Sequence, residues 1–503
     1  MSGYELMDTS TLNRAGFYLP FSGAAVSCDR ETYQAMSRDY GYIPLFVQKE
    51  IPNFNIVEFY QKLNPIPPAC LLESLSGTDN GRYSIVAVKP LQILTSTLND
   101  PQGSGMLRAF MSGATYPKLN FPFYCGGPIG FWSYEEALGF HQLPHRSGSF
   151  TEQFFFVPGE VIVYDRHQHQ ITIIIWSKTS TAAEFNFRCA CRRLDDLLLE
   201  AQTCQGESLR HISASAQEGL DKEFAVNISR EEYCSRVLRA KEHIRQGDIF
   251  QVVLSRRWQK ESAADPWQVY LKLRAINPSP YMFYFQLPDA VLMGASPEMQ
   301  VKVAKGIIKT RPIAGTRKIT GDPATDHDLA RELLQDNKER AEHLMLVDLS
   351  RNDVGRVSKA GSVQVSDFMI LEKYSHVVHI VSTVEGELKE DVDSLEAFQA
   401  CFPAGTLSGA PKRKAMEIIS ELEEDPRGPY GGAAGFVSFN GLLDSCITIR
   451  SILYRGGKYY LQSGAGIVAD SVPEKEHEET LHKARVLMLA IKEAEKARDF
   501  DDR

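Results

Sequence analysis

Two acidic side chains on separate predicted helices are of the type that binds a hard metal ion. Glu342 lies in a long segment of helix-forming composition, on the same stripe as the apolar side chain of Leu346. A buried carboxylate is costly unless a cation compensates it, and Mg²⁺ does so with one or two carboxylates plus ligand oxygens. Glu479 lies near the start of the last long predicted helix. Both acids are also explained without a metal, as a solvated helix face around Glu342 and an ion pair of Glu479 with Lys483.

A guanidinium and two glycine-bearing loops could bind an anion. Arg450 stands in a strand-like apolar segment, where alternation places it on the face of Thr448. Its fork needs a carboxylate, which either this chain or a ligand could supply. The loops 312–316 and 462–467 follow strand-like segments, and glycine lets backbone N–H groups approach an anion closely. A tight turn also explains each loop.

His379 is the histidine best placed for acid–base chemistry. It alternates with Val377 and Val381 in a strand-like run, which is typical of a buried neutral histidine. The alternative is a group that exchanges protons near neutral pH. The sequence has no G-x-S-x-G elbow and no cysteine nucleophile signature, which argues against covalent hydrolase chemistry.

The composition describes a globular chain without a basic surface. Its 503 residues include 55 Lys and Arg against 64 Asp and Glu, a net charge of −9 that argues against general nucleic-acid binding. The nine cysteines contain no C-x-x-C pair, which favours reduced thiols over disulfides or zinc. The N-terminal residues lack a signal or transit pattern, and no apolar stretch is long enough to span a membrane. We therefore expect a cytoplasmic protein.

The elements that must position these residues follow from the hydrophobic pattern. Apolar runs before about residue 200 predict strands, 183–202 predicts a helix, and Ser229 fits the start of another helix. Asn440-Gly441 and Gly456-Gly457 predict hairpin turns on either side of a strand at 443–453. We expect an α+β fold of mainly antiparallel sheets, packed as a sandwich with helices on the outside. Composition divides the chain into an N-terminal region, a linker, a second region and a solvated tail, at 1–205, 206–225, 226–495 and 496–503.

Seven ordered segments show a family resemblance that covers about residues 45–490. They lie at 249–256, 294–298, 311–317, 342–353, 405–412, 428–432 and 464–470. In this order and spacing they resemble the chorismate-utilising enzymes, and among these the family of anthranilate synthase large subunits. The resemblance implies that region 226–495 binds chorismate and catalyses the reaction, and that the first region contributes a regulatory site.

The resemblance assigns the site residues. It implies that Glu342 and Glu479 hold Mg²⁺, which bridges to the ring carboxylate of chorismate. It also implies a set of residues that hold the two substrate carboxylates, namely Gly315, Thr316, Tyr430, Arg450, Gly464, Ala465 and Gly466. A dianion needs a cation, a guanidinium fork and oriented N–H groups, so this set is chemically sensible.

The implied reaction adds ammonia at C2, removes the C4 hydroxyl and eliminates pyruvate to form anthranilate. Glu298 matches the family's acid, and His379 lies where it would assist C4–O cleavage or later proton removal. Relatives that use water carry a lysine where Gln251 stands. Aminodeoxychorismate synthases carry a nucleophilic lysine where Ala314 stands. The residues at both positions, Gln251 and Ala314, therefore favour direct attack of ammonia on C2.

A second set of residues resembles the tryptophan feedback site of anthranilate synthases. Its matching contacts are Ser74, Pro280, Tyr281 and Met282. A strand end and a proline turn would explain these residues without a ligand. Together with this site, the resemblance implies an enzyme that catalyses the first committed step of tryptophan biosynthesis and is inhibited by L-tryptophan.

No glutamine amidotransferase segment is present, because none of the nine cysteines stands in a G-x-C-x-G setting. Use of glutamine would therefore require a separate amidotransferase subunit, component II, in a heterotetramer. Two alternatives stay open: an aminodeoxychorismate synthase that lacks the lysine, and a catalytically inactive protein that senses tryptophan.

Overall fold

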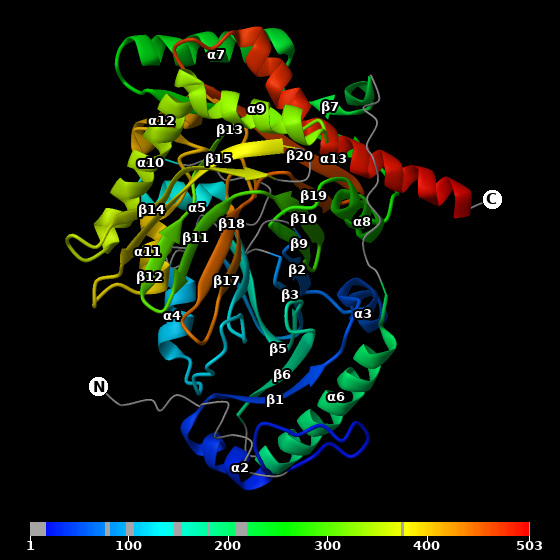
Figure 1. Ribbon diagram of the computed structural model, residues 1–503. Coiled ribbons are helices and arrows are strands. Elements are labelled where there is room, and N and C mark those ends of the chain that lie inside the picture. The colour runs from blue at the N-terminus through cyan, green and yellow to red at the C-terminus, as the bar shows by residue number, and fades with distance from the viewer. Residues whose placement is uncertain are drawn as a thin grey trace.

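The computed structural model describes residues 17–75, 81–96, 105–144, 153–179, 182–206, 219–373 and 377–501. Every strand pairing within these ranges is antiparallel, and helices cover the outside of the strands (Figure 1). The expected α+β class with mainly antiparallel strands is therefore confirmed. All the strands are linked in one network, which divides into two branches.

The first branch forms one broad layer. In order of neighbours it contains β1 (Tyr42–Glu50), β6 (Gln170–Lys178), β5 (Gln153–Asp165), β3 (Tyr83–Ser96), β2 (Ala69–Glu73), β9 (Tyr281–Gln286), β10 (Ala290–Ser296), β19 (Ser451–Arg455), β20 (Lys458–Ile467) and β8 (Gln251–Glu261). The short strands β7 (Ala225–Val226) and β16 (Gly409–Ala410) also pair with β8.

The second branch leaves from β5. It continues through β4 (Ile129–Trp132), β17 (Ala433–Val437), β18 (Leu443–Ile447), β11 (Met299–Ala304), β12 (Ile307–Thr310) and β15 (Val377–Glu387). β13 (Ile313–Lys318) and β14 (Gln364–Lys373) both pair with β15. Residues 160–165 of β5 pair with β6, whereas its residues 153–156 pair with β4. One long strand thus serves both branches.

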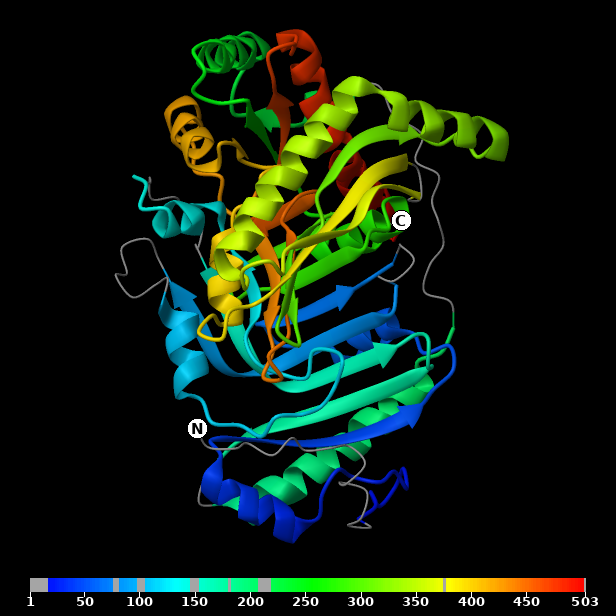
Figure 2. The same cartoon turned by 60° about the vertical axis from the view of Figure 1, so that its left-hand side comes forward.

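Two hydrophobic cores fill the spaces around the first layer. Side chains alternate along each strand, so Cys70 joins one core and Leu71 joins the other. The first core lies between the strand layers. The second lies between the first layer and the helices α2 (Arg30–Asp39), α3 (Ile56–Leu63), α6 (Ala183–Thr203), α8 (Pro266–Ile276) and α13 (Pro473–Asp501). Figure 2 shows α2 and α6 beneath the blue and cyan strands, with the yellow and orange strands above them.

The remaining helices lie beside strands of both branches. They are α4 (Met106–Gly113), α5 (Tyr134–Phe140), α7 (Arg230–Arg245), α9 (Pro323–Gln335), α10 (Asn337–Val357), α11 (Ser394–Cys401) and α12 (Lys412–Leu422), with a 3-10 turn at Leu220–Glu223. The predicted start of α7 is confirmed, because the Ser229 side chain accepts a hydrogen bond from the Glu232 amide. The predicted helix at 183–202 is α6. Within the described residues, no helix has the length and apolar character needed to cross a membrane.

One predicted strand is wrong in its extent. The hairpin turns at Asn440-Gly441 and Gly456-Gly457 are present, but 443–453 is not a single strand. β18 ends at Ile447 and β19 begins at Ser451, since Arg450 has a φ of 50° that no regular strand adopts. The interruption moves the chain from the second branch to the first.

Strands from the two predicted sequence regions pair with each other. β2 lies beside β9, and β4 lies beside β17. The division at residues 205 and 226 stays a prediction about sequence regions, and residues 207–218 of the expected linker lie outside the described residues. Helix α13 continues to Asp501, through most of the segment predicted as a tail.

Candidate active site

A cavity of about 510 Å³ collects most of the predicted site residues. Strands β8, β13, β15 and β20 and helices α10 and α13 contribute to its wall. Nine predicted residues line it: Glu298, Gly315, Glu342, His379, Tyr430, Arg450, Gly464, Gly466 and Glu479. Ala465 lies between two of these with a fully buried side chain. Thr316 follows Gly315 in β13, and only its backbone is described.

Carboxylates from two helices face this cavity. Glu339 and Glu342 come from α10, and Glu476 and Glu479 come from α13. The pKa of Glu342 is raised by its burial and by the negative charges of Glu339 and Glu479. His343, the neighbour of Glu342, is fully buried, so this part of the helix is not the solvated face that the alternative interpretation required.

The donor set fits a magnesium ion that is shared with a ligand. Among the described residues, no group of three or more His, Cys, Asp and Glu side chains could hold a metal ion by itself. Mg²⁺ commonly binds through one or two carboxylates plus oxygens of a substrate, so Glu342 and Glu479 would suffice. The Gln251 amide donates to Glu342 Oε1 at 3.4 Å, while its own buried Oε1 has no hydrogen-bond partner within the described chain. That oxygen could accept from a metal-bound water.

Lys483 is a cavity residue that the sequence indicated only as an ion-pair partner. Its Nζ lies 2.6 Å from Glu479 Oε1 and donates to the carbonyl oxygen of Gly464 at 3.0 Å. The expected pair one helical turn apart is therefore present. Because Lys483 also lines the cavity, it adds a positive charge between the acidic group and the glycine strand.

The backbone at Arg450 aims a guanidinium at the cavity. Its left-handed φ of 50° lies in the interruption between β18 and β19. Within the described part of the chain Arg450 forms no ion pair, although Tyr430, Glu479 and Glu298 all act electrostatically in favour of its charge. Burial lowers its pKa. Of the two possibilities that the sequence left open, this geometry favours a ligand carboxylate.

Glu298 has the properties of a proton donor. It is 7% exposed, and its Oε1 accepts a hydrogen bond from the Thr406 hydroxyl at 3.1 Å. Burial raises its pKa to about 8. A carboxyl with this pKa is mostly protonated at neutral pH and can give its proton to a leaving group.

His379 has the properties of a proton acceptor. Its Nδ1 lies 2.8 Å from the carbonyl oxygen of Gly315, which can only accept a hydrogen bond, so Nδ1 carries the proton. Burial lowers the pKa of the ring, with Arg450 adding to the effect. The ring is therefore neutral at pH 7, and Nε2 is the basic nitrogen.

The glycines of β20 lie so close to neighbouring groups that a side chain at either position would clash. A Cβ at Gly464 would lie 2.8 Å from the Tyr430 hydroxyl and 2.8 Å from the Leu254 carbonyl oxygen. A Cβ at Gly466 would lie 2.5 Å from the Gln251 side-chain nitrogen. The close approach of these groups to the strand explains why glycine stands at both positions.

A second cavity of about 170 Å³ gathers the four residues of the predicted regulatory site. Ser74, Pro280, Tyr281 and Met282 all line it, together with the aromatic rings of Tyr83, Phe123, Tyr124, Phe283 and Phe436. Lys302 and Asp444 form an ion pair of 2.8 Å in its wall. The Ser74 hydroxyl is buried, and no described residue hydrogen-bonds to it. An aromatic wall with charges of both signs could hold an aromatic amino acid.

Comparison with known proteins shows the family of this chain. Residues 70–489 match the model of the chorismate binding enzyme family, so the chain belongs to that family. Two relatives are described as anthranilate synthase component 1. That of Acetivibrio thermocellus is 43% identical over 483 residues, which cover 91% of this chain and 97% of that protein. That of Aquifex aeolicus is 38% identical and covers 93% of this chain and 98% of that protein.

Solved structures share the fold. The crystal structure of anthranilate synthase component I from Streptococcus pneumoniae TIGR4 matches with a TM-score of 0.70 and 32% identity, covering 88% of this chain and 99% of that chain. The menaquinone-specific isochorismate synthase from Escherichia coli matches with a TM-score of 0.68. Its identity is 16%, with coverage of 92% of this chain and 98% of that chain, so this likeness concerns the fold alone.

Proposed function

We propose that this chain is a lyase that converts chorismate and ammonia to anthranilate and pyruvate, the first committed step of tryptophan biosynthesis. The observation that carries the proposal is the single cavity that unites a carboxylate pair, a protonated acid, a neutral base and an arginine without an ion pair in the described chain. Relatives described as anthranilate synthase component 1 support it.

Binding of chorismate uses its two negative charges. Arg450 offers a fork for one carboxylate, and the Tyr430 hydroxyl and the strand from Gly464 to Gly466 lie beside it in the cavity wall. The β13 segment that contains Gly315 and Thr316 forms another side of the cavity. Mg²⁺ held by Glu342 and Glu479 would neutralise the ring carboxylate and draw charge from the ring.

The chemistry needs one proton donor and one acceptor. Ammonia forms a bond to C2, the double bond shifts, and the C4–O bond breaks as Glu298 protonates the departing hydroxyl to give water. The C3–O bond then breaks as a ring proton leaves C2, which makes the ring aromatic, and the released enolpyruvate takes up a proton at its methylene carbon to give pyruvate. His379 is suited to remove a proton at Nε2, because its Nδ1 is already held by Gly315. Glu298 recovers its proton from solvent or from the ammonium group.

Two cavity residues favour ammonia as the nucleophile over water or a side-chain amine. Gln251 is a neutral amide that cannot deprotonate water. Ala314 lines the cavity where a lysine would attack C2 directly, and it has no nucleophilic atom. The aminodeoxychorismate alternative is therefore the weaker candidate.

The second cavity is the proposed site of feedback inhibition by L-tryptophan. Its aromatic rings match an indole, Asp444 offers a partner for the ammonium group, and Lys302 offers one for the carboxylate. The unsatisfied Ser74 hydroxyl is a further hydrogen-bonding group. A strand end that served only folding would not need a buried hydroxyl without a partner.

The proposed partner is a glutamine amidotransferase subunit, component II, which supplies ammonia in a heterotetramer. Hydrolysis of glutamine needs a reactive thiolate. In this chain burial raises the pKa of eight cysteine thiols, and no cysteine lines the candidate active site. The ammonia must then come from another chain or from solution.

Fluorescence of anthranilate tests the proposal with the purified chain. We expect product from chorismate, Mg²⁺ and ammonium chloride, and none when glutamine replaces ammonium. Formation of a 4-amino adduct in place of anthranilate would reject the assigned product. Turnover of glutamine by the chain alone would reject the need for a partner.

A further inference from the structure

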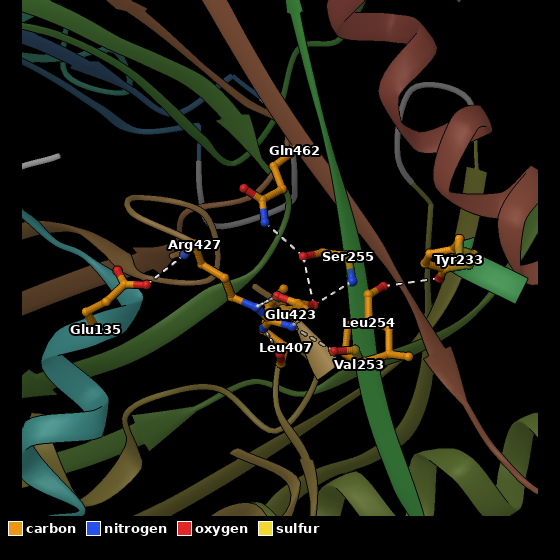
Figure 3. Close-up of polar contacts among 9 residues, drawn as sticks. All are labelled: Glu135, Tyr233, Val253, Leu254, Ser255, Leu407, Glu423, Arg427 and Gln462. Carbon is orange, nitrogen blue, oxygen red and sulfur yellow. Dashed lines mark hydrogen bonds and ion pairs between the residues drawn. The ribbon is translucent and has the colours of Figure 1, made fainter. Parts of the chain in front are cut away.

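A buried ion pair lies directly behind the wall of the candidate active site. Arg427 is 3% exposed and Glu423 is 8% exposed. The guanidinium binds the carboxylate through two hydrogen bonds of 2.8 Å, one from Nε and one from Nη2 (Figure 3). Neither residue lines the cavity. Any effect of the pair on the substrate must therefore pass through other residues.

The other donors of Arg427 bind the backbone of two cavity residues. Nη1 donates to the carbonyl oxygen of Leu407 at 2.7 Å, and Nη2 donates to that of Val253 at 2.7 Å. Val253 lies in β8, whereas Leu407 lies in the turn after α11. Both residues line the cavity, so one side chain fixes the relative position of two separate wall segments.

Glu423 extends the same unit to a third segment. Its Oε1 accepts from the backbone amide of Ser255 at 2.7 Å and from the Ser255 hydroxyl at 3.0 Å. That hydroxyl in turn accepts from the Gln462 side chain at 2.8 Å. Gln462 belongs to β20 and lines the cavity, two residues before Gly464.

The fourth segment carries Tyr430. The carboxylate of Glu135, on α5, accepts from the backbone amides of Arg427 at 2.7 Å and Gly428 at 3.0 Å. The Arg427 guanidinium lies 5.9 Å from the centre of the Tyr430 ring and 4.6 Å from that of Tyr134. A cation at this distance is attracted by a ring face and draws electron density from it. Arg427 thus contacts the ring of Tyr430, which lines the cavity.

We propose that Arg427 and Glu423 are positioning residues that set the geometry of the chorismate cavity. The proposal rests on the function proposed above. A buried ion pair is by itself weak evidence for stability, because removing two charges from water costs about as much as their attraction returns. Here the pair binds the wall segments of Val253 and Leu407 directly and that of Gln462 through Ser255. Arg427 also precedes Tyr430 by three positions and contacts its ring. Displacing such a wall by a fraction of an ångström weakens substrate binding.

Glu423→Gln and Arg427→Lys test the pair with little change in volume. The first removes the charge but keeps an acceptor oxygen. The second keeps the charge, but one ammonium cannot reproduce the fork that reaches Glu423 and two carbonyl oxygens. Glu160→Gln is the matched control, because Glu160 is 3% exposed, accepts from Arg193 at 2.7 and 3.0 Å and lines neither cavity.

Calorimetric binding of chorismate with Mg²⁺ and without ammonium measures the effect in the absence of amination. We expect Glu423→Gln and Arg427→Lys to weaken binding about tenfold, which corresponds to about 1.4 kcal/mol. KM should rise in step, and kcat should change by less than about threefold. The control should lower the melting temperature by a similar amount and leave chorismate affinity at the wild-type value.

A milder variant decides the question if the charge variants do not fold. Ser255→Ala keeps the ion pair and the hydrogen bond from the Ser255 amide to Glu423, and removes only the hydroxyl that links Glu423 to Gln462. We expect a weakening of about twofold to fourfold. Wild-type affinity in this variant, or in a folded Glu423→Gln protein of lowered melting temperature, would overturn the proposal. If the wild-type chain binds chorismate but forms no anthranilate, the proposed reaction fails while the positioning role is still judged by binding.

Discussion

The surroundings of Glu298 favour the protonated form of its carboxyl group. It has almost no contact with water, and this burial outweighs the groups that favour its charged form, which are the Thr406 hydroxyl, one backbone amide and the charges of Lys483 and Arg450. The sequence resemblance selected Glu298, but nothing in its local sequence predicts a pKa of about 8. Thr406, which lies 108 positions further along the chain, approaches only in the folded protein.

The pH dependence of the reaction rate should follow the loss of the proton from the Glu298 carboxyl group. The pKa of Glu298 in the folded chain is above its ordinary value, so the acid form dominates below about pH 8 and is lost as pH rises through that value. We therefore expect the rate at saturating chorismate and limiting ammonia, divided by the concentration of free NH₃, to fall above about pH 8. Steady-state rates from pH 6 to 10 would measure it.

Glu298→Gln should remove the acid and keep the shape. We expect kcat to fall about a hundredfold or more, which is typical for loss of a general acid, with little change in the affinity for chorismate. The alkaline fall should disappear from the residual rate. A variant that kept the wild-type kcat would show that another group protonates the leaving hydroxyl.

Helices α10 and α13 bring Glu342 and Glu479 to one cavity from widely separated parts of the chain. The periodicity predicted both helices, because capping residues and apolar stripes are local features. It could not show that their acidic faces meet across β13 and β20, which depends on the packing of the whole sheet. The interruption before Arg450 is also beyond a local pattern, since alternation continues through residues 448–450 while the strand does not.

Glu479→Gln tests the role of α13 in metal binding. One carboxylate fewer leaves Glu342 alone to hold the ion, so the Mg²⁺ concentration for half-maximal activity should rise by about tenfold or more. Glu478→Gln is the control, because Glu478 lies on the same helix and does not line the cavity. Equal magnesium requirements in the two variants would remove Glu479 from the proposed ligands.

Across the whole molecule, strands run from the wall of the smaller cavity to the wall of the larger one. β9 contributes Tyr281 to the smaller cavity and pairs with β10, in which Ser296 precedes Glu298 by two positions. β18 contributes Asp444 and ends shortly before Arg450, whose carbonyl oxygen accepts from the Ala295 amide at 3.0 Å. A ligand in the smaller cavity therefore contacts β18, which leads to the proposed carboxylate anchor, and β9, which pairs with the strand that leads to the proposed acid.

The hairpin signals allowed the α+β class to be predicted, because each Asn-Gly or Gly-Gly turn is encoded locally. The sharing of β5 by both layers was not predictable. The runs at 154–157 and 161–164 suggest two strands, and the structure has one strand whose pairing partners change along its length. The smaller cavity depends on this arrangement, since its residues come from both layers.

Inhibition by tryptophan should depend on the smaller cavity and not on the larger one. The Ser74 hydroxyl is buried there without a described partner, so a bound amino acid would gain a hydrogen bond from it. For Ser74→Ala we expect the tryptophan concentration for half-inhibition to rise about tenfold, which corresponds to about 1.4 kcal/mol. The rate without tryptophan should not change. Ser84→Ala is the control, because that hydroxyl is also buried without a described partner but lies outside the cavity. Loss of inhibition in both variants, or in neither, would place the tryptophan elsewhere.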